Sequence, residues 1–263
     1  MEGRASEVVV ANLLFIAFWI SAVAILLVAG RRGRLQSFRS KMLAQWRPAL
    51  VIAALFVLGM VLAGESLLNP YGLAVFCQAL IGLALARGIQ DYEPLPVARA
   101  FARRERILHS VGLMLLVALL LVPVALAIGS VGLSIAQQIF GEVSRSEEAM
   151  GTLPQNDLQV FFALLAGAGI AEETIYRLVL LSLLWRWTRR RWLSTILSAL
   201  VFAAYHLTPL NGMYRTFLQF PASQFLASVL IGIVWGYVYV KRGYETAVLA
   251  HTFSDWLPFL IFA

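Results

Sequence analysis

Long apolar stretches alternate with short polar connections along the whole chain. A helix needs about 20 apolar residues to cross the hydrocarbon core of a bilayer. An open sheet in lipid would leave backbone groups unpaired, so these stretches predict helices. The pattern therefore predicts an all-α, polytopic membrane protein with about eight transmembrane helices. The expected spans are 8–30, 48–64, 67–86, 111–131, 158–187, 192–206, 222–240 and 246–262.

Basic residues gather in every second connection. By the positive-inside rule these four connections are cytoplasmic, which places both termini on the opposite, non-cytoplasmic side. Segments 31–47 and 90–110, which mix basic residues with aromatics and leucines, are either interfacial helices or solvated loops. The basic residues in question are Arg31, Arg32, Arg34, Arg39, Lys41 and Arg47, then Arg99, Arg103, Arg104 and Arg106, then Arg189, Arg190 and Arg191, and finally Lys241 and Arg242.

The composition agrees with a membrane setting. Of the 263 residues, 60% are hydrophobic and only 13% are charged, and mean hydropathy is +0.80. The net charge of +7 comes from basic residues between the spans, so it reflects membrane orientation and not nucleic-acid binding. The single cysteine, Cys77, excludes an intramolecular disulfide. We expect a single membrane domain, residues 1–263, located in a bacterial-type plasma membrane. The expected partner is the lipid bilayer, and no binding to nucleic acid is expected.

Ionisable residues inside the apolar stretches are the candidates for function, because charge at bilayer depth costs several kcal/mol. The first half of the chain has little such polarity beyond Asn12, Asn69 and Gln78. The candidate chemistry therefore lies after about residue 157.

The fifth stretch contains Glu172, Glu173 and Arg177. Glu173 and Arg177 are four residues apart, the spacing that favours an ion pair on one helical face. Glu172 points about 100° away from Glu173, so a Glu173–Arg177 pair leaves Glu172 free to face a different cavity. The alternative is a network of all three side chains that only packs helices together.

Two further pairs with the same spacing follow. Phe202 can pack beneath His206, and Asp255 can orient His251. The residues themselves leave two chemistries open: Glu172, His206 and His251 bind a divalent metal such as zinc, or the group activates water without a metal. The His-Glu-x-x-His spacing of helical zinc proteases is absent.

In order and approximate spacing, these three motifs resemble the CAAX prenyl protease and bacteriocin-processing (CPBP) family, also called the ABI or type II CAAX endopeptidase family. The resemblance covers roughly residues 157–263, with 1–157 as accessory helices. It implies an intramembrane endopeptidase with eight helices around an active-site cavity, acting on a membrane-associated peptide or protein. As a glutamic protease it would require no cofactor, although members were long described as metalloproteases.

The resemblance also implies roles for the motif residues. Glu172 and His206 would activate water, and His251 with Asp255 would stabilise the oxyanion. The supporting residues Glu173, Arg177 and Phe202 would hold the site in place.

The chain departs from the family pattern at two positions. Leu178 stands where the family usually has glycine, directly after the motif arginine, and Asp255 stands where CAAX-processing members typically have asparagine. An ionised Asp255 would repel an oxyanion, so it must be protonated or act through His251.

The two histidines also differ in expected depth. At about 1.5 Å per residue, His206 lies roughly 20 Å from the start of its span and His251 only about 8 Å from the start of its own. Boundaries, tilt or a re-entrant segment must bring them together.

Two other functions compete with the protease. A scaffold or bacteriocin-immunity protein would keep the fold without cleavage. A proton-coupled transporter would use the buried Glu and His residues as a relay.

Overall fold

The computed structural model describes residues 2–30, 35–142 and 156–262. Within these ranges the regular structure is entirely helical, which confirms the all-α prediction. The elements are α1 (Glu2–Ala29), α2 (Gln36–Ala44), α3 (Trp46–Leu62), α4 (Tyr71–Ala86), α5 (Pro96–Arg103), α6 (Ile107–Phe140), α8 (Asp157–Leu164), η2 (Leu165–Glu172), η3 (Thr174–Leu181), α9 (Ser182–Thr188), α10 (Arg191–Tyr205), α11 (Tyr214–Phe217), α12 (Pro221–Arg242) and α13 (Tyr244–Phe262).

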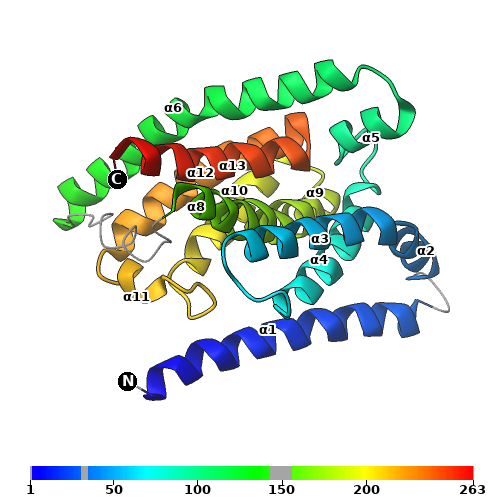
Figure 1. Ribbon diagram of the computed structural model, residues 1–263, viewed down its shortest axis with the longest axis horizontal. Helices are drawn as coiled ribbons and strands as arrows, with labels where there is room; N and C mark the ends of the chain where they lie inside the picture. Colours follow the sequence, from blue (N-terminus) through cyan, green and yellow to red (C-terminus); the bar gives the residue numbers. More distant parts are fainter. Residues whose placement is uncertain (1, 31–34, 143–155, 263) are drawn as a thin grey trace.

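The long helices lie roughly side by side (Figure 1). Helix α6 covers α12 and α13 on one side of the bundle, and α1 lies against α4 on the opposite side. Both termini are at the same end of the helices, and α2 and α5 are at the other end (Figure 1). The even number of predicted crossings requires this placement of the termini, although it does not say which end is cytoplasmic.

Each of the eight predicted spans coincides with helix in the structure. In the described part of the chain, only four helical stretches are long and apolar enough to cross a bilayer alone, or five if α2 and α3, bent by 53°, count as one span. Helices α4 and α10 are apolar but shorter than a typical span. The four stretches are Val9–Ala29, Ile107–Phe140, Asp157–Thr188 and Pro221–Arg242.

The two basic connecting segments contain the short helices α2 and α5. The N-terminus of α5 is docked onto the start of α13, where the Glu245 carboxylate accepts hydrogen bonds from the backbone N–H groups of Val97 (2.8 Å) and Ala98 (2.7 Å). A carboxylate satisfies otherwise unpaired N–H groups at a helix start. The Tyr244 N–H donates to the carbonyl of Pro94, two residues before α5, at 2.8 Å.

The helical stretch 157–188 changes its winding in the middle. Segments η2 and η3 are π-helical, and Glu173 is the residue between them. Such winding is rare and is often found at functional sites. Near this junction the Thr174 hydroxyl donates to the Ile170 carbonyl at 2.6 Å, and the Tyr244 hydroxyl of α13 lies 2.7 Å from Thr174 Oγ1. Helix α13 is therefore bonded to the segment that carries the two glutamates.

Helix α4 crosses η3 so closely that the backbones of the two helices are almost in contact. A Cβ atom on Gly82 would lie 2.8 Å from Leu178 Cγ and 3.0 Å from the Leu178 carbonyl oxygen. Leu178 is fully buried. The larger residue after the motif arginine is thus accommodated by a glycine on the opposing helix.

Candidate active site

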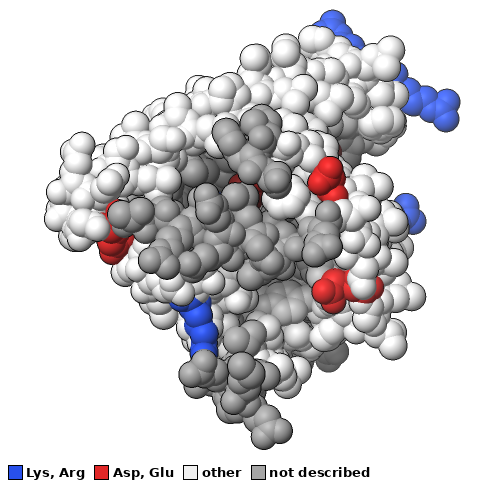
Figure 2. All heavy atoms as spheres, turned by 60° about the vertical axis from the view of Figure 1, so that its left-hand side comes forward, with Lys and Arg blue, Asp and Glu red and all other residues white. Residues whose placement is uncertain are grey.

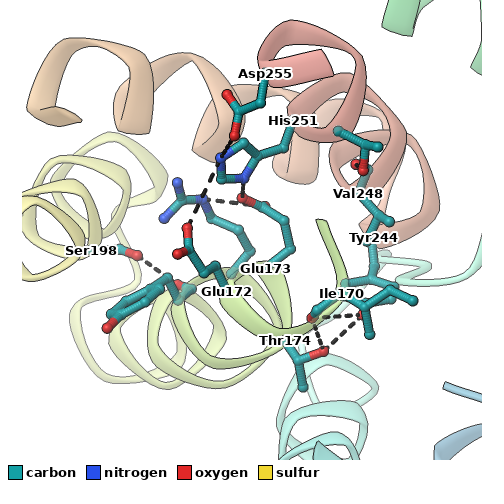
Figure 3. Close-up of polar contacts among 12 residues, drawn as sticks. Ile170, Glu172, Glu173, Thr174, Ser198, Tyr244, Val248, His251 and Asp255 are labelled. Carbon is teal, nitrogen blue, oxygen red and sulfur yellow. Dashed lines mark hydrogen bonds and ion pairs between the residues drawn. The ribbon is translucent and has the colours of Figure 1, made fainter. Parts of the chain in front are cut away.

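Glu172, Glu173, His251 and Asp255 meet at one place (Figure 3). The two glutamates come from the end of η2 and the junction that follows it, and the other two residues come from α13. The i, i+4 spacing of His251 and Asp255 keeps both on the face of α13 that looks toward the glutamates. The structure therefore brings together two of the three predicted motifs through direct polar contacts between their side chains.

His251 is contacted by three carboxyl groups. Its Nδ1 atom lies 2.9 Å from Glu173 Oε1. Its Nε2 atom lies 3.5 Å from Asp255 Oδ2 and 4.0 Å from Glu172 Oε2. Because Nδ1 is in hydrogen-bond contact with a carboxylate, we assign a proton to Nδ1. Nε2 then faces Glu172 and Asp255.

The ring of His251 is also held by aromatic contacts. The buried indole of Trp235 on α12 stacks on it, with ring centroids 5.6 Å apart and planes 28° apart. The Phe202 ring meets it edge-on at 5.9 Å. Trp235 was not among the candidates from the sequence, because an aromatic residue in an apolar span gives no polar signal.

Glu173 does more than the expected pairing with Arg177. The Nε atom of Arg177 lies 3.4 Å from Glu173 Oε2, and both side chains are fully buried. The guanidinium also lies over the Phe202 ring, 4.8 Å from its centroid. Glu173 thus links Arg177 to His251, which sequence spacing did not indicate.

Glu172 and Glu173 face different surroundings. Glu173 is fully buried and pairs with Arg177, whereas Glu172 lines the cavity described below. The pair thus leaves Glu172 free to face the cavity. Both carboxyl groups also approach the His251 ring, Glu173 at Nδ1 and Glu172 at Nε2.

His206 lies at the C-terminal end of α10 and is buried. Its Nδ1 atom is 2.9 Å from the Phe202 carbonyl oxygen. A carbonyl only accepts hydrogen bonds, so Nδ1 carries the proton and Nε2 is left as an acceptor. The Phe202 ring lies 4.7 Å from the His206 ring, as the i, i+4 spacing predicted.

The contacts of Phe202 show how the two histidines reach the same level despite their different expected distances from the starts of their spans. Its ring contacts both imidazoles, so His251 is level with a residue one turn before His206. One turn is about 5.4 Å. This offset is comparable to the length of a side chain, so both histidines reach the same cavity.

A cavity of about 540 Å³ connects these residues. Glu172, His206, His251 and Asp255 all line it, although they come from three parts of the chain. It extends to α1, where Asn12 and Phe15 form part of its wall. The space-filling view of one face of the molecule shows few charged side chains among mostly uncharged described residues (Figure 2). Such a surface suits an apolar environment.

The three polar residues noted in the apolar stretches of the first half of the chain, Asn12, Asn69 and Gln78, also line this cavity. Asn12 accepts a hydrogen bond from the Tyr71 hydroxyl at 2.8 Å, and Asn69 accepts one from the Tyr71 N–H at 3.0 Å. Together with Gln78 they form part of the cavity wall that the first half of the chain contributes. Their polarity at bilayer depth was visible in the sequence, but nothing in the sequence connected them to the motifs.

The carboxyl and imidazole groups of the site are not arranged as a set of metal ligands. Within residues 2–30, 35–142 and 156–262, no three His, Cys, Asp or Glu side chains are placed to hold a metal ion. Glu172, His206 and His251 thus line one cavity without converging on a common point.

Comparison with known proteins agrees with the motifs. A family model described as type II CAAX prenyl endopeptidase Rce1-like matches residues 154–257. No curated protein and no solved structure matches the chain. The matched segment begins just before α8 and ends two residues after Asp255, so it contains every motif residue. The chain is an integral membrane protein, and its residues 154–257 are similar to the Rce1-like, type II CAAX prenyl endopeptidase family of proteases.

Proposed function

We propose that the protein is an intramembrane endopeptidase that hydrolyses a peptide bond of a membrane-associated peptide or protein, in CAAX-type or related processing. The observation that supports this most is one cavity lined by Glu172, His206, His251 and Asp255. Residues 157–263 would form the catalytic core and residues 1–157 the accessory helices of a single membrane domain.

The reaction would begin with activation of a water molecule. The Glu172 carboxylate accepts one proton from the water as its oxygen attacks the carbonyl carbon of the scissile peptide bond. His206 Nε2, an acceptor by its tautomer, orients the same water through its second proton. The support for this pairing is that both side chains line the cavity.

Attack on the carbonyl carbon produces a tetrahedral intermediate with a negatively charged oxygen. A protonated His251 Nε2 would donate a hydrogen bond to this oxyanion. Glu173 would keep the imidazole oriented through its contact with Nδ1, which is 2.9 Å long. Asp255, 3.5 Å from Nε2, would act through His251.

The intermediate then collapses. The carbon–nitrogen bond breaks, and the proton that Glu172 took from water passes to the leaving nitrogen. The products are a carboxylic acid and an amine, and Glu172 returns to its carboxylate form. The same residue serves first as general base and then as general acid.

The test is cleavage by the purified protein in nanodiscs, read by mass spectrometry. The substrates are peptides ending in Cys-aliphatic-aliphatic-X, with and without a farnesyl group on cysteine, together with an unbiased peptide library. We expect cleavage by the wild type and a loss of at least about 100-fold in Glu172→Gln and His206→Ala, the usual size of a general-base contribution.

Glu65→Gln is the matched control, since Glu65 is an exposed carboxylate outside the cavity. It should cleave at the wild-type rate, and a chelator should not slow the wild type. Wild-type rates in Glu172→Gln would contradict the mechanism. No cleavage of any peptide by the wild type would favour the scaffold function.

A further inference from the structure

The cavity continues past Glu172 toward α4 and α1. On this side its wall combines apolar residues, with Phe15, Phe56 and Val75 among them, and a few polar ones. None of the four proposed catalytic residues comes from this side. Any polar group that points into it therefore needs an explanation other than the chemical step.

Gln78 is such a group. It lies in the middle of α4, is only 2% exposed, and lines the cavity. Asn12 and Asn69 on the same side each use their side-chain oxygen in a hydrogen bond to Tyr71. The amide of Gln78 has no hydrogen-bond partner among the residues that the structure describes. Both its donor and its acceptor are available to an occupant of the cavity.

Helix α4, which carries Gln78, packs against η3, the segment that follows the glutamates. Gly82, one turn later on α4, contacts Leu178 of η3 at backbone distance. Ala171 and Ile175, on either side of the Glu172–Glu173 pair, line the cavity together with Gln78. The close crossing leaves little freedom for α4 to move relative to η3. Gln78 is thus held at a fixed position in the wall of the cavity that Glu172 also lines.

A primary amide in an apolar cavity matches the chemistry of a peptide main chain. A peptide that enters this cavity loses water from its N–H and C=O groups, and each unpaired group costs free energy. The glutamine amide can donate to a main-chain carbonyl and accept from a main-chain N–H. A hydrogen bond between the Gln78 amide and the peptide main chain would therefore provide a partner for both groups.

We propose that Gln78 is a substrate-binding residue that hydrogen-bonds one main-chain amide of the substrate near the scissile bond. The proposal rests on the protease function proposed above and adds a recognition contact from α4, outside the motif-bearing segment. Because the main chain is common to all peptides, the contact selects an extended backbone placed at one register and not a particular side chain.

The test removes the proposed hydrogen bond in two ways, first by changing the side chain of the protein and then by changing the main chain of the peptide. Gln78→Met keeps the length of the side chain without its amide, and Gln138→Met, at an exposed position on α6, is the matched control. The first probe is the farnesylated peptide ending in Cys-aliphatic-aliphatic-X. The other probes are versions of this peptide that each carry one N-methyl group, at a different backbone nitrogen in each version. Thermal unfolding in detergent verifies that each variant is folded.

We expect Gln78→Met to lower kcat/KM about 3- to 10-fold, chiefly through KM, as is usual for one hydrogen bond. One N-methylated peptide should lose activity with the wild type and show no such penalty with Gln78→Met. The other N-methyl penalties should be the same in both proteins, and Gln138→Met should behave as the wild type.

Two results would overturn the assignment while leaving the protease intact: unchanged kcat/KM in a folded Gln78→Met protein, or the same N-methyl penalties in both proteins. Binding of the same peptides to the Glu172→Gln variant, read by fluorescence anisotropy, separates the two proposals. Gln78-dependent binding without cleavage by the wild type would contradict the protease alone. Absence of both binding and cleavage would overturn both.

Discussion

At the scale of single residues, the three carboxyl groups around His251 are not equivalent. Glu173 is fully buried and bonded to Nδ1, whereas 40% of the Asp255 side chain is exposed on the Nε2 side. A buried charge needs a partner, which Glu173 has in Arg177, but an exposed carboxylate can be solvated. Asp255 is therefore the member of the group that tolerates substitution best.

We expect Asp255→Asn to fold and to keep kcat/KM within about tenfold of the wild type. The amide is nearly isosteric, and its N–H₂ group does not repel an oxyanion as a carboxylate does. Peptide cleavage kinetics measure the effect. A loss of more than about 100-fold would instead show that the carboxyl group itself transfers a proton.

The Glu173–Arg177 pair predicts a stability effect. Glu173→Gln leaves a fully buried guanidinium without its counter-charge, which should lower the free energy of unfolding by about 3–5 kcal/mol. The double variant Glu173→Gln with Arg177→Met removes both charges and should regain most of that stability. Denaturant unfolding in detergent measures both, and equal stability of the single and double variants would show that the pair is not coupled.

At the scale of elements, apolar patterning predicted where the helices are but not how each is wound. Each predicted span coincides with helix because its length and hydropathy determine it. The π-helical winding around Glu172 and Glu173 depends on contacts such as that of Tyr244 with Thr174, which join residues far apart in the chain. Local sequence carries no sign of them. The spacing of the two glutamates predicted that Glu172 is free to face the cavity, but it did not indicate that both carboxyl groups approach the same imidazole.

The crossing of α4 and η3 gives a prediction for packing. Gly82→Ala places a methyl group within 3.0 Å of the Leu178 backbone and should destabilise the protein by about 1–3 kcal/mol, as overpacking does. Gly112→Ala on α6 is the control, because a Cβ atom added there would meet nothing within 4 Å. It should be neutral or stabilise by up to about 1 kcal/mol. Equal unfolding midpoints for the two variants would refute the close contact.

At the scale of the whole molecule, the two halves of the chain share one cavity. The sequence located the motif residues in the second half, and the family match agrees with that. Nothing in the sequence indicated that Asn12 of α1 or Gln78 of α4 belongs to the site, because their spacing from the motifs has no regular period. Only the packing of α1 against α4, and of α4 against η3, brings them to the cavity wall.

The arrangement of the helices makes the topology testable. Ser37 on α2 and Phe140 at the end of α6 are exposed at opposite ends of the bundle (Figure 1). With Cys77 replaced by alanine, Phe140→Cys should react with a membrane-impermeant maleimide added to intact cells, and Ser37→Cys should react only after permeabilisation. This follows from the positive-inside rule. The reverse labelling would place the termini in the cytoplasm.

Helix α1 forms part of the cavity wall and is long and apolar enough to cross a membrane, so the proposed enzyme would meet its substrate within the plane of the bilayer. Their encounters then depend on how many substrate molecules there are per lipid, not per litre of buffer. We expect the Michaelis constant to be a mole fraction in the bilayer. Diluting the enzyme and a fixed amount of substrate with additional lipid should slow cleavage, whereas enlarging the aqueous volume should not.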